Sequence, residues 1–181
     1  MASGLIMVDI QNDYFPGGAM ELVGMEQASK NAAALLRRFR EAGRPVYHVQ
    51  HFSVNPGATF FLPDTEGVLT HNSVTPQGDE SVTSKNFPNA FRATDLEQQL
   101  RTDQVDSLVI CGAMSHMCID ATARAGFDLG FTCTVAGDAC ATRDLAFGER
   151  NVTAADVHAA FMSALGSVYA TVTTTDLVTP D

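Results

Sequence analysis

Three residues of chemically reactive types occur near the ends of short apolar segments. Asp9 lies in the run LIMVDIQ, Lys85 ends the run SVTSK, and Cys118 follows VDSLVICG and the short segment GAMSHM. Each has an ordinary interpretation when it is taken singly, as a carboxylate that caps backbone amides, a solvated charge and a packed thiol. An acid inside an apolar run is nevertheless costly to bury without a partner. The three residues therefore mean more together than apart.

An acid, a lysine and a cysteine at one site can perform nucleophilic catalysis. A thiol with a free pKa near about 8.5 is only a few per cent ionised at pH 7, and the thiolate is the nucleophile. A helix N-terminus contributes about 1 kcal/mol at most, so a thiolate at Cys118 needs a cation such as Lys85. Asp9 can take the thiol proton and later return it to a leaving amine. The spacing along the chain does not by itself show that the three converge.

Apolar runs and amphipathic segments alternate along the chain and must position these residues. Strands are predicted over residues 4–10, 44–52, 81–85, 105–112, 131–136 and 168–173. Helices are predicted over residues 25–39, from a capping box at 94–97 to 101, over 115–129, and from 151 or 153 to 165. The alternation predicts a three-layer α/β/α fold, Rossmann-like, with a mostly parallel sheet of about six strands and helices on both faces.

In folds of this kind the ligand crevice lies outside the carboxyl ends of the strands. Asp9, Lys85 and Cys118 each end or follow a different predicted strand, which places them at the same edge. Residues 53–78 form a long segment that contains several Pro and Gly, and a loop of that length in a compact domain is usually functional. The first strand is followed by QNDYFPGG instead of G-x-G-x-x-G, so no phosphate cradle for a nucleotide is expected there.

Composition limits the class of protein. The 181 residues, of which 45% are hydrophobic, predict a single domain covering residues 1–181. A net charge of −10, from 11 Lys+Arg against 21 Asp+Glu, argues against nucleic acid and anionic membrane as partners. No basic leader and no run of 18 apolar residues occur, so a cytoplasmic protein is expected. Besides Cys118, the chain has three cysteines that are interpreted as packing residues, namely Cys111, Cys133 and Cys140.

Four segments in order resemble the isochorismatase-like cysteine hydrolase superfamily, which includes nicotinamidase-related amidases. They are VDIQNDYFPGG (8–18), VQHF (49–52), SKNFPNAF (84–91) and CGAMSHMCIDATARAG (111–126). The resemblance covers nearly the whole chain and implies the isochorismatase-like hydrolase fold, with Asp9, Lys85 and Cys118 as the catalytic triad. It also implies a cis peptide bond between Ala113 and Met114, and an oxyanion hole formed by the backbone amides of Met114 and Cys118. Ser115 stands where the family often has Thr, and the hydroxyl is kept.

A small aromatic pocket is expected beside the nucleophile. Its predicted walls lie in the loops that follow strands, where they either exclude water from a planar substrate or simply anchor the loops. The residues predicted to bind substrate are Gln11, Tyr14, Phe15, His51, Phe61 and Phe87. No cofactor is expected.

A metal site is not expected either. Nicotinamidases of this superfamily bind a divalent metal through an Asp-x-His pair and further histidines after the second strand. This chain has His48 and His51 in that region, three residues apart and therefore on opposite faces of a strand, with His71 in the following loop. At most two of the three histidines can converge, whereas a metal site needs three or four ligands.

Three hypotheses for the function follow. The first is a hydrolase that cleaves a C–N bond of a small amide, ureido or carbamoyl compound through a thioester on Cys118. The second is vinyl ether hydrolysis of the isochorismatase type, in which Asp9 protonates the substrate and Cys118 is a bystander. The third is a non-catalytic scaffold member. By resemblance the chain is also expected to form a homo-oligomer, a dimer or a tetramer, and to take a small-molecule substrate.

Overall fold

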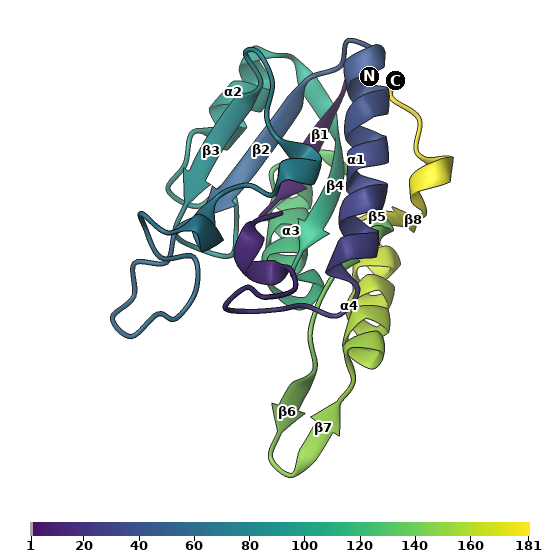
Figure 1. Ribbon diagram of the computed structural model, residues 1–181. Coiled ribbons are helices and arrows are strands. Elements are labelled where there is room, and N and C mark those ends of the chain that lie inside the picture. Colours follow the sequence, from purple (N-terminus) through teal and green to yellow (C-terminus); the bar gives the residue numbers. More distant parts are fainter. Residues whose placement is uncertain (1) are drawn as a thin grey trace.

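The computed structural model describes residues 2–181 and contains a central sheet in which all neighbouring strands are parallel (Figure 1). The spatial order is β3 (Ser81–Lys85), β2 (Val46–His51), β1 (Ala2–Val8), β4 (Val105–Ala113), β5 (Thr132–Ala141) and β8 (Thr171–Thr173). The predicted parallel sheet of about six strands is therefore confirmed.

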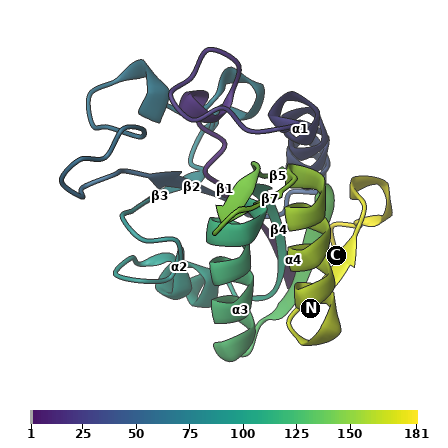
Figure 2. The same cartoon turned by 90° about the horizontal axis from the view of Figure 1, so that it is seen from below.

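Helices cover both faces of this sheet, as Figure 2 shows in the view from below. In β1, Leu5 and Met7 belong to the core on the side of α1, whereas Ile6 and Val8 belong to the core on the opposite side. This alternation is expected of a strand that is buried on both faces. The helices are α1 (Met25–Glu41) on one face, and α2 (Leu96–Thr102), α3 (Asp120–Asp128) and α4 (Ala154–Val168) on the other.

The carboxyl edge of the sheet carries the long connections. Here lie three short 3-10 turns, η1 (Asn12–Tyr14), η2 (Glu66–Val68) and η3 (Asn72–Val74), and the antiparallel hairpin of β6 (Leu145–Phe147) and β7 (Arg150–Val152). The hairpin extends away from the body, and both chain ends lie at the opposite end of the molecule (Figure 1).

Several predicted boundaries are wrong. The first strand ends at Val8, before Asp9, and β5 continues past residue 136, so that Asp138 lies within the strand instead of after it. The last helix extends to Val168, and the last strand therefore begins only at Thr171. The hairpin of β6 and β7 was not predicted, because strands of three exposed or half-exposed residues have no apolar pattern.

Two predicted helix starts also differ. Helix α2 begins after Asp95, and the proposed capping box does not form, because the Thr94 hydroxyl donates instead to the Ala90 carbonyl. The segment predicted as a helix from residue 115 begins with a π-helical turn, η4 (Ser115–Ile119), and becomes α-helical only at α3. No helix within residues 2–181 has the length and apolar character needed to cross a membrane.

Candidate active site

The sheet brings the three reactive residues to one place at its carboxyl edge. Asp9 directly follows β1, Lys85 is the last residue of β3, and Cys118 lies in the π-helical turn after β4. In the parallel register His51 of β2 pairs with Lys85, and Val8 pairs with Gly112 of β4, so these strands end close to one level.

Lys85 joins this group. Its Nζ atom lies 2.7 Å from Asp9 Oδ2, 3.2 Å from Cys118 Sγ and 2.8 Å from His51 Nδ1. Asp9, Lys85 and Cys118 are only 0%, 1% and 5% exposed, so the charges are shielded from water. A buried ammonium needs such acceptors, because an unpaired charge is very costly to bury. The structure thus places Asp9, Lys85 and Cys118 together, and adds His51 to them.

The electrostatics of the group set its resting protonation state. Burial lowers the pKa of Lys85, but the charges of Asp9 and Cys118 outweigh it, and the net pKa is raised, which keeps the ammonium charged. Burial raises the pKa of Cys118, and Asp9 raises it further, while Lys85 lowers it. The net effect is upward, so the resting group is a thiol. The expected help from Lys85 is present, but it is outweighed.

The two carboxylate oxygens of Asp9 differ in their contacts. Its backbone has the left-handed φ of 51°, its amide donates to the Val49 carbonyl at 2.9 Å, and its carbonyl accepts from the Gln11 amide at 3.0 Å. Oδ2 accepts from Lys85, whereas Oδ1 is buried and has no partner among the described residues. A free carboxylate oxygen beside a thiol can accept the proton of that thiol.

The backbone before the cysteine has the expected unusual bond. The peptide bond between Ala113 and Met114 is cis. The Met114 carbonyl accepts hydrogen bonds from the amides of Met117 and Ile119, at 3.0 and 3.2 Å, which fixes the turn that carries Cys118. Within residues 2–181 the Met114 amide donates to no other group, so it remains available to a bound molecule.

A pocket of about 390 Å³ opens beside Cys118. Of the six residues predicted to bind substrate, Tyr14, His51 and Phe61 line it. The ring centroids of Tyr14 and Phe61 are 4.5 Å apart, and those of Phe60 and Phe61 are 5.0 Å apart, so the aromatic wall is continuous. Its remaining lining residues are Ser53, Asn55, Pro56, Gly57, Ala58, Asn86, Pro88, Met114 and Met117.

The other three predicted substrate-binding residues do not line this pocket. The Gln11 side chain is used by the backbone: Nε2 donates to the carbonyls of Val68 and His51, and Oε1 accepts from the His51 amide. Phe15 stacks on His71, with ring centroids 3.6 Å apart. The Arg92 guanidinium carbon lies 3.7 Å from the centroid of the Phe87 ring, so Phe87 packs against Arg92. Gln11 thereby holds the backbone of His51, which lines the pocket, whereas Phe15 and Phe87 pack on residues outside the lining.

The three histidines do not come together. His48 is buried and lies 2.9 Å from Glu80 near the amino end of β2, and the Nδ1 atom of His71 contacts the Ser73 hydroxyl. His51 lies instead near Asp9 and Cys118, with donor atoms all within 4.8 Å of one another. The Lys85 ammonium already contacts all three, and its positive charge opposes a cation there. The residues present therefore do not fit the metal site known in nicotinamidases.

Sequence reasoning missed two supports of the pocket. Asp13 is buried, and its carboxylate accepts from the amides of Ala19 and Phe61, which ties the loop after β1 to the pocket wall. Ser115 is fully buried, and its hydroxyl lies 2.8 Å from His158 Nδ1 on α4. An acid within an otherwise Pro- and Gly-rich loop was the available signal for Asp13. The partner of Ser115 is 43 residues away in the chain, and no local pattern indicates it.

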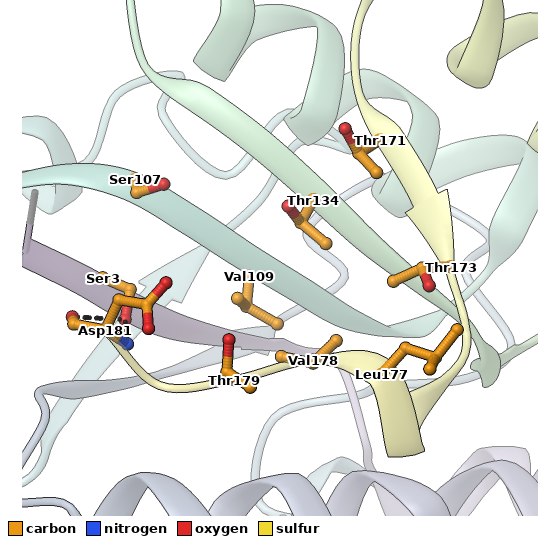
Figure 3. Close-up of a pocket in the computed structure, with 10 residues that line it drawn as sticks. All are labelled: Ser3, Ser107, Val109, Thr134, Thr171, Thr173, Leu177, Val178, Thr179 and Asp181. Carbon is orange, nitrogen blue, oxygen red and sulfur yellow. Dashed lines mark hydrogen bonds between the residues drawn. The ribbon is translucent and has the colours of Figure 1, made fainter.

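A second cavity, of about 330 Å³, lies far from this site toward the amino ends of β1, β4 and β5 (Figure 3). Mainly Ser, Thr and Val side chains line it, and Asp181 closes one side through its hydrogen bond with Ser3. None of the buried ionised groups described above faces it, so it offers no comparable chemistry.

The fold is of the three-layer α/β class, and a pocket lies beside Cys118 at the carboxyl edge of its sheet. Residues 3–176 match the family model described as the isochorismatase domain. The chain belongs to the isochorismatase family of hydrolases, as the sequence resemblance implied.

Individual relatives agree with this assignment. The isochorismatase family protein YddQ of Bacillus subtilis (strain 168) is 52% identical over 176 residues, which cover 97% of this chain and 98% of YddQ. A solved isochorismatase-family structure from Oleispira antarctica is 49% identical, with a TM-score of 0.93, and covers 97% of this chain and 94% of that one. A maleamate amidohydrolase of Pseudomonas putida is 30% identical over 141 residues, covering 70% of this chain and 66% of that protein.

Proposed function

We propose that the protein hydrolyses a C–N bond of a small amide, ureido or carbamoyl compound through a thioester on Cys118. The observation that carries the proposal is the divided role of Asp9, whose Oδ2 holds Lys85 while its buried Oδ1 has no partner among the described residues. That free oxygen can receive the proton of the neighbouring thiol. Similarity to a protein named maleamate amidohydrolase supports amide chemistry.

The first half of the reaction forms the thioester. Asp9 takes the thiol proton as Cys118 Sγ bonds to the substrate carbonyl carbon, and the carbonyl π electrons move onto oxygen. The amides of Met114 and Cys118 donate to this oxyanion, and one such donor is typically worth about 10²–10³ in rate. The C–N bond then breaks, the nitrogen takes the proton from Asp9, and ammonia or an amine leaves.

The second half releases the acid. Asp9 takes a proton from water as the water oxygen bonds to the thioester carbon, and a second tetrahedral oxyanion forms in the same amides. This intermediate collapses, the C–S bond breaks, and Asp9 returns the proton to Cys118 sulfur. Lys85 keeps its proton throughout, and its charge offsets the negative charge that moves between Asp9 and Cys118.

The pocket limits the substrate to a small molecule. About 390 Å³ accommodates a compact planar group against Tyr14, Phe60 and Phe61. With a net charge of −10, the chain offers no general attraction to a dianion such as isochorismate, which favours neutral amides. We propose a cytoplasmic location, which is supported by the four unpaired cysteines.

A screen of small amides and ureides with ammonia detection tests the proposal. Replacing Cys118 by Ala or Ser should reduce turnover more than about 10³-fold, because no other group can form the thioester. Cys133→Ala is the matched control, since Cys133 is also buried but lies on β5 against α3, and its replacement should leave turnover nearly unchanged. Mass spectrometry of wild-type protein quenched during turnover should show an acyl group on Cys118.

The alternatives give different outcomes in the same screen. Undiminished amide turnover by Cys118→Ala would overturn the thioester mechanism. Turnover of isochorismate that survives this change would favour protonation of a vinyl ether by Asp9. Absence of turnover across amides, ureides and isochorismate, with no acyl group on Cys118, would favour the non-catalytic scaffold.

A further inference from the structure

The Lys85 ammonium has three N–H donors, and the structure provides one acceptor for each. These acceptors are Asp9 Oδ2 at 2.7 Å, His51 Nδ1 at 2.8 Å and Cys118 Sγ at 3.2 Å. The His51 contact is only 0.1 Å longer than the Asp9 contact, at 2.8 against 2.7 Å, although His51 carries no formal negative charge to attract the lysine. A protonated lysine can only donate, so His51 Nδ1 must accept.

This contact fixes the protonation of the His51 ring. Because Nδ1 offers its lone pair to Lys85, a neutral imidazole must carry its proton on Nε2. The titratable groups around the ring are Lys85 on β3, Asp9 after β1 and the Cys118 thiol after β4, with the Tyr14 phenol from η1 across the pocket. Burial lowers the pKa of His51 and Lys85 lowers it further, against a smaller opposing effect of Asp9, and the ring is therefore neutral near pH 7.

The backbone of His51 is held at the position that this contact requires. The Gln11 side chain accepts a hydrogen bond from the His51 amide at 2.8 Å and donates one to the His51 carbonyl at 3.0 Å. It therefore binds both backbone polar groups of His51. The ring lines the pocket, with its centroid 5.9 Å from that of Phe61. Nε2 has no hydrogen-bond partner within residues 2–181.

We propose that His51 is a positioning residue that holds the Lys85 ammonium between Asp9 and Cys118 and presents its Nε2–H to the pocket as a donor for an acceptor atom of the substrate. This inference rests on the proposed function of the same site. It adds a fourth residue to the three that the resemblance implied, and it favours a substrate with a carbonyl or carboxylate oxygen near the ring over one with an N–H group there.

The tautomer can be measured without any substrate. Long-range ¹H–¹⁵N correlation spectra of protein labelled at histidine, assigned with His51→Gln, distinguish a protonated from an unprotonated ring nitrogen. Between about pH 6 and 8 we expect Nε2 protonated and Nδ1 unprotonated. In Lys85→Met the His51 resonances should titrate at higher pH, because a neighbouring positive charge has been removed. An Nδ1–H tautomer or an imidazolium at His51 in the wild-type protein would overturn the proposal. This result does not depend on whether Lys85→Met folds.

Acylation of Cys118 tests the positioning role. The probe is p-nitrophenyl acetate, with release of p-nitrophenolate measured after subtraction of the Cys118→Ala rate. We expect His51→Phe, which keeps a ring but removes both nitrogens, to slow acylation about 10- to 100-fold, as misplacement of a catalytic group does. His51→Gln should recover part of the rate, because its amide can accept from Lys85 and still donate to the pocket. If His51 only filled space, His51→Phe would be acylated faster than His51→Gln, because the Phe ring keeps more of the volume of the His ring.

His71→Gln is the matched control. His71 lies in the connection after β2 and contacts Phe15 and Ser73, but not Lys85, so its replacement should leave acylation at the wild-type rate. Equal rates for wild type and His51→Phe would overturn the positioning role while leaving the thioester mechanism intact. If wild-type Cys118 is not acylated at all, the proposed function fails in this assay, and the tautomer measurement still decides the Lys85 contact.

Discussion

At the scale of single residues, the site is organised around one lysine that is 1% exposed. Residue types near predicted strand ends were enough to select Asp9, Lys85 and Cys118 and to predict that they share an edge. They were not enough to predict the net direction of the Cys118 pKa, because burial has a larger effect than Lys85 and depends on the whole surrounding core. The contact of His51 with Lys85 could not be predicted from the sequence either, since it depends on which ring nitrogen faces Lys85.

Asp9→Asn separates the reactivity of the thiol from turnover. The carboxylate raises the pKa of Cys118, so its loss leaves the Lys85 ammonium as the main charged neighbour and lowers that pKa. We expect alkylation of Cys118 by iodoacetamide at pH 7 to accelerate at least about threefold. Amide turnover should fall more than about 10²-fold, because the proton acceptor is lost.

The control for this change is Asp138→Asn on β5. The Asp138 carboxylate accepts hydrogen bonds from Thr175, and neither residue lines the pocket, so replacing Asp138 should alter neither rate. An alkylation pH profile that is unchanged in Asp9→Asn would show that the carboxylate does not interact with the thiol.

At the scale of elements, the apolar runs predicted most strands because those strands are buried on both faces. The extension of β5 could not be predicted, because its Asp138 carboxylate accepts hydrogen bonds from Thr175, 37 residues later. The sequence predicted that Lys85 and Asp9 lie at the same edge of the sheet, but not that they are in contact. The contact forms because the Lys85 side chain of β3 reaches Asp9 across the end of β2, which lies between β3 and β1.

The contact between β1 and β4 near Cys118 requires a glycine. Gly112 has a φ of +122°, and a Cβ atom at this position would lie 2.0 Å from the Val8 carbonyl oxygen. We expect Gly112→Ala to lower the free energy of unfolding by at least about 3 kcal/mol in urea denaturation. Gly137→Ala on β5 is the control, because its Cβ would meet Val172 at an ordinary 3.5 Å. Similar stabilities of the two variants would contradict this explanation.

The amino end of β2 is fixed by an ion cluster. Glu80 accepts from Arg40 at 2.6 and 2.8 Å and contacts the buried His48 at 2.9 Å. Although partial burial raises the pKa of Glu80, the hydrogen bonds from Arg40, the Gln77 amide and His48 lower it to about 2. A carboxyl with a lowered pKa in the folded state stabilises the fold above its unfolded pKa and loses this contribution as the pH falls through its folded pKa.

Glu80→Gln should therefore destabilise the protein at pH 7 by about 1–2 kcal/mol, a figure that allows for partial solvent screening. The difference from wild type should shrink as the pH falls from 4.5 towards about 2. Urea unfolding at several pH values measures it, with the exposed neighbour Asp79→Asn as control. A difference that is independent of pH would point to lost packing instead of lost charge.

At the scale of the whole molecule, we propose a homo-oligomer, a dimer or a tetramer. The hairpin of β6 and β7 extends from the body (Figure 1). Phe147, the last residue of β6, is 86% exposed. An isolated two-stranded hairpin is marginally stable in water, and an exposed Phe favours contact with another surface. Light scattering after size-exclusion chromatography should give two or four times the mass of one chain, and the mass of a single chain would contradict the proposal.

The buried lysine also has a consequence for how the chain folds. Its acceptors come from the residue after β1, the last residue of β2 and the turn after β4, and the pair of Lys85 and Asp9 joins residues 76 positions apart. A partly assembled sheet would leave the ammonium either in water, with the surrounding core open, or desolvated without its full set of acceptors. The desolvated and incompletely paired state is penalised relative to both the folded and the unfolded chain. The same atoms that prepare the chemistry therefore favour cooperative assembly of β3, β2, β1 and β4.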